Sequence, residues 1–139
     1  MSLEDLYQDV ILEHSQSPRR SEALKIVTDS SIAKNPLCGD MVKIEVHIEE
    51  GIVKDLCCKT NGCAISTAAG SIMASEIVGK SREEAIALTE NFILSLKDNK
   101  DLNESSEDLC ILSQVGQYPT RIKCAVLPWN ALREMLVAS

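Results

Sequence analysis

The chain is poor in aromatic residues and has no long apolar run. Its 139 residues include one Trp, one Phe and two Tyr. A membrane-spanning helix needs roughly 20 consecutive apolar residues, and no stretch of this sequence comes near that length, so we expect no membrane segment. The first residues are acidic, and no apolar stretch follows them, which argues against a secretory signal. We therefore expect a cytoplasmic protein.

Basic residues are also in short supply. Lys and Arg total 14 against 21 Asp and Glu, which gives a formal net charge of −7. Binding to nucleic-acid phosphates needs a basic surface, so this balance argues against a nucleic-acid partner. The hydrophobic fraction of 45% and the length suit one globular domain that spans 1–139.

Cysteine, by contrast, is plentiful, with six residues. Disulfides persist in oxidising compartments, and a chain of this length can build a hydrophobic core without them. We therefore consider disulfides the weaker explanation. Metal binding, thiol chemistry and simple burial all remain open.

Apolar and polar residues alternate in the first half of the chain, which predicts a sheet. Residues 41–49 alternate strictly, a pattern typical of a half-buried strand. Glu50-Gly51 predicts a turn, and residues 52–60 form the expected hairpin partner. A short strand at about residues 25–30 would complete a three-stranded antiparallel sheet.

Helical patterns account for most of the remaining sequence. Small residues are frequent in one of these segments, and Ser81 and Glu84 form a capping box at the start of another. Because strands come first and most helices later, we predict an α+β fold with the helices packed on one face of the sheet. The expected helices cover residues 3–15, 63–78, 81–96, 106–115 and 120–137, and a polar loop is expected at 97–107.

Pro128 interrupts the last predicted helix. Proline has no N–H, so it removes the helical hydrogen bond that residue 128 would donate to the carbonyl of Cys124. We predict an irregularity near 124–128, either a kink or a new helix that begins at Pro128.

Three segments carry residues that could do chemistry. Cys38 and Asp40 lie in a Pro- and Gly-containing turn before a strand, and a thiolate and a carboxylate are both zinc ligands. Cys63 lies where a strand meets a helix N-terminus, which favours a thiolate. Cys124 follows Arg121 and Lys123, whose charges have the same effect.

Each of these segments also has an ordinary structural explanation. Cys38 could be an incidental loop residue, Cys63 a small buried residue, and the cations before Cys124 the exposed side of a helix. The three cysteines are 25 and 61 residues apart, so their spacing alone is weak evidence for a metal site.

The other cysteines fit structural roles better. Cys57 and Cys58 are neighbours in a strand, so their side chains point to opposite faces. We expect Cys58 in the core and Cys57 partly exposed. Cys110 lies among apolar residues and is expected to pack in the core, and Trp129 is expected to anchor the last helix.

Three motifs, taken together and in order, resemble a known family. N-P-L-C-G-D at 35–40, N-G-C-A-I-S at 61–66 and R-I-K-C-A at 121–125 are similar to motifs of the IscU/SufU/NifU-type iron–sulfur cluster assembly proteins. The segment L-Y-Q-D-V-I with His14 also resembles the first helix of that family. The resemblance implies a SufE/IscU-like fold.

The resemblance points to the SufU-like branch. IscU-type scaffolds carry a His directly before the third Cys and an L-P-P-V-K motif upstream, whereas this chain has Lys123 and no such motif. The stretch between the second and third Cys is also long, which implies an inserted segment at about 97–117, as in SufU-like proteins.

This branch implies a zinc site and a sulfur-transfer role. Its zinc ligands would be Cys38, Asp40, Cys63 and Cys124. Cys38 would be the catalytic sulfur acceptor, and Arg121 and Lys123 would have auxiliary electrostatic or docking roles. The implied partners are a PLP-dependent, SufS-like cysteine desulfurase and downstream iron–sulfur assembly or acceptor proteins.

Three functions stay open at this point, and they are ranked here from the most to the least favoured. The first is a zinc-dependent sulfurtransferase that accepts persulfide sulfur on Cys38. The second is a non-enzymatic scaffold that builds iron or an iron–sulfur cluster on Cys38, Cys63 and Cys124, since three thiolates suit iron–sulfide as well as zinc. The third is a non-catalytic interaction module with a structural zinc.

Overall fold

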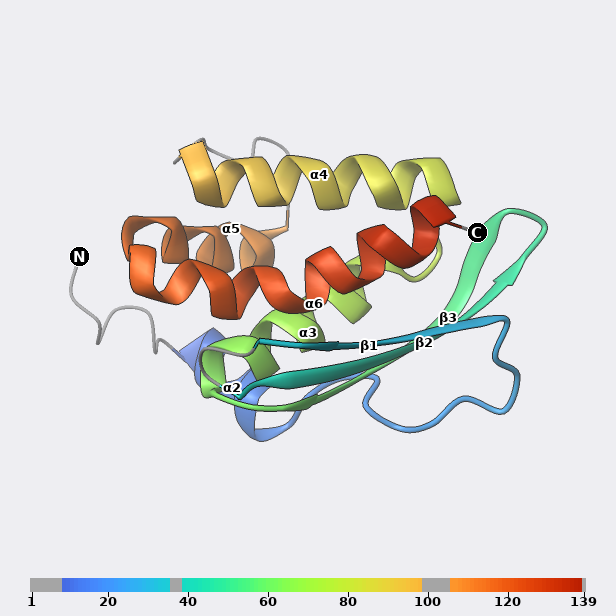
Figure 1. The fold of residues 1–139 in the computed structure, drawn as a ribbon, viewed down its shortest axis with the longest axis horizontal. Helices are drawn as coiled ribbons and strands as arrows, with labels where there is room; N and C mark the ends of the chain where they lie inside the picture. Colours follow the sequence, from blue (N-terminus) through green and yellow to red (C-terminus); the bar gives the residue numbers. More distant parts are fainter. Residues whose placement is uncertain (1–8, 36–38, 99–105, 139) are drawn as a thin grey trace.

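A computed structural model of the chain describes residues 9–35, 39–98 and 106–138 (Figure 1). It confirms the α+β prediction, with a three-stranded antiparallel sheet in the order β1-β2-β3. None of the described helices combines the length and the apolar character needed to cross a bilayer. The elements are α2 (Asp9–Gln16), β1 (Asp29–Lys34), β2 (Met41–Glu49), β3 (Ile52–Asn61), α3 (Ala64–Ile77), α4 (Arg82–Asp98), α5 (Glu107–Ser113), η1 (Gln114–Gln117) and α6 (Pro119–Ala138).

The central hairpin follows the sequence pattern closely. Val42, Ile44 and Val46 of β2 are fully buried, and the polar residues between them face the other side of the sheet. Glu50 and Gly51 both have positive φ, at 54° and 76°. Positive φ at both central residues is characteristic of a type I′ turn, whose twist matches that of the flanking strands.

The first strand lies further along the chain than predicted. The expected strand at 25–30 overlaps β1 only at its last two residues, and Ile26 and Val27 are 59% and 42% exposed. The ladder with β2 runs from Asp29 opposite Val46 to Lys34 opposite Met41. It stops at Thr28, whose hydroxyl accepts the next hydrogen bond, from the Ile48 N–H at 2.9 Å.

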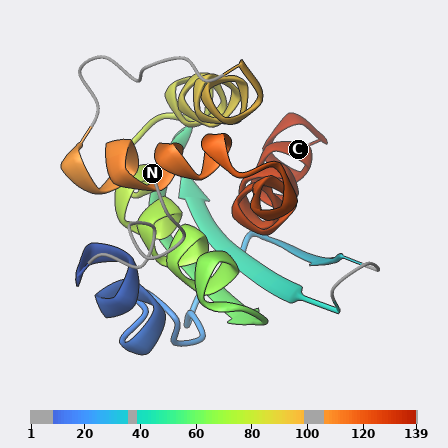
Figure 2. The same cartoon turned by 90° about the vertical axis from the view of Figure 1, so that its left-hand side faces the viewer.

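The helices form layers on one face of the sheet. Figures 1 and 2 show α3 and α6 against the sheet, with α4 beyond them. The small residues of α3 permit this packing. A Cβ on Gly70 would lie 2.7 Å from the Cys58 sulfur and 3.0 Å from the Thr60 hydroxyl, so any side chain there would push the helix away from β3.

Specific residues fix where the helices begin and end. Cys63 is the N-cap of α3, and Gly79, with φ of +93°, follows its end. The predicted capping box is present: the Glu84 N–H donates to the Ser81 hydroxyl, and the Ser81 N–H donates to the Glu84 carboxylate, both at 3.1 Å. Part of the predicted first helix, residues 3–8, and part of the predicted loop, residues 99–105, lie outside the described residues.

The last helix continues through Pro128. The alternative of a new helix that begins at Pro128 is therefore wrong, because α6 is one helix from Pro119 to Ala138. Figure 1 shows that its axis bends near the middle, and Pro128 is the tenth of its 20 residues. Burial of Pro128 and of its neighbour Trp129 in the core offsets the missing helical hydrogen bond.

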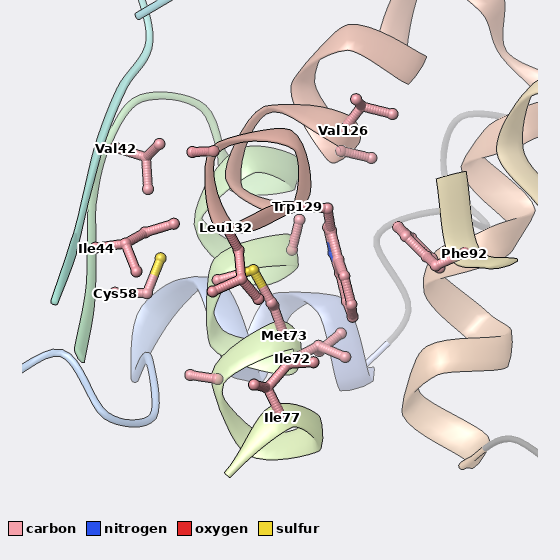
Figure 3. Close-up of a cluster of buried hydrophobic side chains, with 14 of the residues drawn as sticks. Val42, Ile44, Cys58, Ile72, Met73, Ile77, Phe92, Val126, Trp129 and Leu132 are labelled. Atoms are coloured by element: carbon pink, nitrogen blue, oxygen red, sulfur yellow. The ribbon is translucent and has the colours of Figure 1, made fainter. Parts of the chain in front are cut away.

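Trp129 anchors this helix as predicted. Its side chain is fully buried, and its ring lies 4.5 Å from that of Phe92, between centroids. Figure 3 shows the two rings beside Val126, with Leu132 and Met73 on the side nearer the sheet. The contact joins α6 to α4 and closes the core.

Both strand cysteines are buried, which corrects the prediction for Cys57. Cys57 is only 3% exposed, and the segment at residues 20–24 is hydrogen-bonded to the sheet beside it. The Cys58 N–H donates to the Arg20 carbonyl at 2.9 Å, and the Leu24 N–H donates to Glu45, which lies opposite Cys57. Burial raises the pKa of Cys58 to about 12, and burial followed by the nearby Glu45 carboxylate raises the pKa of Cys57.

His14 joins three helices. It is 4% exposed, and its Nε2 donates to the Asp108 carboxylate of α5 at 2.9 Å. Its Nδ1 is hydrogen-bonded to the hydroxyl of Ser71 on α3 at 2.6 Å, and that hydroxyl also accepts from the Arg19 N–H at 2.8 Å. His14 therefore fixes α2 to α3 and α5.

We predict that His14→Ala lowers the free energy of unfolding by about 2 kcal/mol, because it removes two largely buried hydrogen bonds. Urea denaturation measures this change. His47→Ala is the matched control, since the His47 ring is only weakly paired with Glu49, at 3.6 Å on the sheet surface. That variant should stay within about 0.5 kcal/mol of the wild type. Equal losses for both variants would contradict the linking role of His14.

We also predict that the Cys58 thiol makes the protein sensitive to alkali. Below about pH 9 the thiol is neutral in both folded and unfolded chains, so its contribution is fully present. Between about pH 9 and about pH 12 the unfolded thiol ionises while the folded one stays neutral, so stability falls as pH rises.

Denaturation measured between pH 9 and pH 11 tests whether stability falls as pH rises. The folding equilibrium constant of the wild type should fall faster than that of Cys58→Ala, by up to about tenfold per pH unit. Cys110→Ala, which removes a half-buried thiol of α5, is the control for the loss of a cysteine elsewhere in the chain. Parallel curves for the wild type and Cys58→Ala would be the contrary result.

Candidate metal centre

Three potential metal ligands meet at one point of the described structure. Ligand atoms of Asp40, Cys63 and Cys124 all lie within 4.8 Å of one another. These residues are 23 and 61 positions apart in sequence, and each belongs to a different element. Asp40 directly precedes β2, Cys63 caps α3, and Cys124 is in α6. Packing of α3 against both β3 and α6 brings them together.

Asp40 is buried, at 4% exposure, and is held through backbone and side chain. Its carbonyl accepts from the Asn35 N–H at 2.8 Å, which closes the loop between β1 and β2. Its Oδ1 accepts from the Cys63 N–H at 3.2 Å, and its Oδ2 accepts from the Ser66 hydroxyl at 2.6 Å. The carboxylate is thereby oriented by the first turn of α3.

Gly62 makes this approach possible. A Cβ at this position would lie 2.5 Å from Oδ1 of Asp40 and 2.6 Å from its Cγ. No side chain fits between the backbone before α3 and the carboxylate. The glycine of the N-G-C motif is therefore required by the close packing of the site.

Cys63 presents its sulfur at the N-terminus of α3. Its backbone is extended, with φ of −72° and ψ of 168°, and its Sγ accepts from the Ser66 N–H at 3.4 Å. Negative charge is favoured at this end of a helix, where backbone N–H groups lack helical partners. The half-buried sulfur thus lies at the helix N-terminus and accepts from one of the N–H groups there.

Cys124 lies in α6 and is 6% exposed. Its carbonyl accepts a hydrogen bond from the Ser66 hydroxyl at 3.1 Å. This carbonyl is the one to which a non-proline residue at position 128 would donate. Pro128 therefore accounts for the availability of the Cys124 carbonyl to a residue of another helix.

The donor set suits a thiophilic divalent metal. Two sulfurs and one carboxylate within 4.8 Å are ligand types that zinc takes, and thiolates also suit iron–sulfur clusters. Three protein ligands leave room for a fourth. The structure thus brings together three residues that could hold a metal ion.

The other predicted site residues are Cys38, Arg121 and Lys123. Cys38 lies outside the described residues, so its role stays a prediction. Arg121 is half-buried and Lys123 is exposed, both in the first turns of α6 near Cys124. Their auxiliary roles also stay predictions.

Sequence reasoning missed Ser66 as a member of the site. It is fully buried and contacts Asp40, Cys63 and Cys124. A signal was available, since Ser66 is three residues after the helix-capping Cys63, and the residue at that position faces its cap. From the sequence, Ser66 was counted only among the small residues of this helix and was given no role in the site.

Comparisons with known proteins find relatives that match nearly the whole chain. The chain is 37% identical to the "Iron-sulfur cluster assembly scaffold protein IscU" of Streptococcus pyogenes serotype M1, over 99% of this chain and 86% of that protein. It is 35% identical to the "Zinc-dependent sulfurtransferase SufU" of Bacillus subtilis (strain 168), over 96% and 90%.

A solved structure shares the fold. It is that of a proposed iron–sulfur cluster assembly scaffold protein for the SUF system from Fervidobacterium islandicum AW-1, with a TM-score of 0.87 and 26% identity over 97% of this chain and 99% of that one. Residues 6–137 match the family described as the NifU-like N terminal domain. The chain therefore belongs to the NifU-like N terminal domain family, which includes the IscU and SufU proteins.

Proposed function

We propose that this chain is an iron–sulfur cluster assembly protein that accepts persulfide sulfur from a cysteine desulfurase on Cys38, at a zinc site. The observation that carries the proposal is the convergence of Asp40, Cys63 and Cys124 within 4.8 Å. Cys38 is two residues before Asp40 and would be the fourth ligand. The similarity to the zinc-dependent sulfurtransferase SufU supports zinc as the metal.

The proposed transfer is a thiol–disulfide type of exchange. The Cys38 thiolate attacks the outer sulfur of a persulfide on the desulfurase, and a new S–S bond forms. The original S–S bond breaks, and its electron pair leaves with the desulfurase cysteine as a thiolate. Cys38 then carries the persulfide, with no external oxidant or reductant.

The other site residues hold the acceptor environment. Asp40 and Cys63 are locked to each other by the hydrogen bond from the Cys63 N–H to Oδ1. A bound zinc ion would keep the thiols of the set deprotonated. Lys123 and Arg121 would add positive charge near the thiolates or dock the desulfurase, and the PLP-dependent, SufS-like enzyme is the proposed donor.

A second candidate function is an iron–sulfur scaffold on the same ligands. The 37% identity to a protein named as an IscU scaffold favours it. Three thiolates from Cys38, Cys63 and Cys124 would hold the cluster. Its cargo would then be an assembled cluster instead of a single sulfur atom.

Metal content and sulfur acceptance test the first function. The purified chain should hold about one zinc per molecule and should stimulate a PLP-dependent cysteine desulfurase supplied with cysteine. Cys38→Ala should remain folded by circular dichroism. Its stimulation of the desulfurase should fall by at least about tenfold, because the variant lacks the nucleophile. Cys110→Ala should match the wild type. Unchanged stimulation by Cys38→Ala would refute the acceptor role.

Anaerobic reconstitution separates the two functions. Under the sulfur-acceptor proposal, iron and sulfide should yield no cluster that transfers to an apo-ferredoxin, even though the protein stimulates the desulfurase. Absorption near 400 nm during transfer reports the outcome. A coloured cluster that moves to the apo-protein, with no stimulation of the desulfurase, would instead establish the scaffold function.

A further inference from the structure

Ser66 occupies the middle of the metal centre although it is not one of the predicted ligands. Its hydroxyl oxygen lies 2.6 Å from Oδ2 of Asp40, 3.1 Å from the Cys124 carbonyl and 3.5 Å from the Cys63 sulfur. The side chain is fully buried. One hydroxyl therefore touches a residue of the loop before β2, the cap of α3 and a residue of α6.

The hydrogen-bonding chemistry ranks these contacts. A hydroxyl has one proton, and the short bond to a carboxylate is the stronger of the two that it can donate. The longer contact with the Cys124 carbonyl is the minor branch of a three-centre bond. The 3.5 Å contact with the Cys63 sulfur is the longest of the three, and either atom can be its donor.

Pro128 is the reason that this second branch reaches α6. In an uninterrupted helix the N–H of residue 128 would donate to the Cys124 carbonyl, but proline has none. The hydroxyl of Ser66 donates to this carbonyl instead. The position of Cys124 is thus tied to the same atom that orients Asp40.

We propose that Ser66 is the positioning residue of the metal centre, which sets metal affinity by holding the Asp40 carboxylate and the Cys124 backbone in place before the metal arrives. The inference rests on the proposed function, because it requires that Asp40, Cys63 and Cys124 bind a metal. Residues that hydrogen-bond to a ligand typically change metal affinity by about 10- to 100-fold when they are removed.

Ser66→Ala in the full chain, titrated with zinc against a chromophoric chelator, tests the inference. Affinity should fall about 10- to 100-fold, and the Co²⁺-substituted protein should show a changed d–d absorption band. Ser71→Ala is the matched control: Ser71 is also a buried serine of α3, about 7.5 Å further along the helix. Its affinity should stay within about threefold of the wild type, although it also loses buried hydrogen bonds.

The pair Ser66→Thr and Ser66→Val gives a second test at equal side-chain volume, which decides the matter if Ser66→Ala does not fold. The threonine variant keeps a hydroxyl and should bind zinc at least about tenfold more tightly than the valine variant. Two results would overturn the role of Ser66, each together with an unchanged Co²⁺ spectrum. One is equal zinc affinity of the wild type and Ser66→Ala, and the other is equal zinc affinity of Ser66→Thr and Ser66→Val. Failure of the wild type to bind zinc or Co²⁺ would overturn the proposed metal site itself, and this inference with it.

Discussion

The close approach of α3 to β3 at Gly70 determines much of this structure. A single Cβ at that point would be 2.7 Å from the Cys58 sulfur, so the helix lies as near the sheet as its backbone permits. Because α3 begins three residues after β3 ends, its N-terminus lies beside the end of that strand, where Gly62 allows Asp40 to pack against the backbone. The same helix receives α2 through Ser71 and packs against α6. Each ligand of the metal centre is therefore positioned relative to α3.

The site itself depends on one glycine, one proline and one serine as much as on its ligands. Gly62 removes a side chain that would displace Asp40, and Pro128 removes an N–H that would otherwise bind the Cys124 carbonyl. Ser66 then connects the two ligand-bearing segments. None of these residues would ligate the metal. They nevertheless fix the relative position of groups that are far apart in sequence, which is the condition for a preorganised site.

Local patterns predicted the fold where local physics decides it. Strict alternation located β2 at residues 41–49, and the Ser81–Glu84 capping box located the start of α4. The strand at 25–30 was wrong because the β-branched residues Ile26 and Val27 are exposed, whereas pairing with β2 selects Asp29–Lys34. The burial of Cys57 was missed because the segment beside it, at residues 20–24, is brought there by tertiary structure.

In the candidate site, too, the sequence predicted what depends on local residues and missed what depends on tertiary packing. The family motifs singled out Cys38, Asp40, Cys63 and Cys124, but the convergence of three of them depends on helix packing that no spacing rule expresses. Ser66 was within reach of capping rules, since it follows Cys63 by three residues. The contributions of Cys38, Arg121 and Lys123 remain predictions from the resemblance.

X-ray absorption spectroscopy of the purified, metal-bound chain tests the central claim most directly, because it identifies the metal and counts its ligands. The account predicts zinc with three sulfur ligands at about 2.3 Å and one oxygen ligand at about 2.0 Å. Bound zinc with fewer than two sulfur ligands, or with the same spectrum after Asp40→Ala and Cys63→Ala, would contradict it.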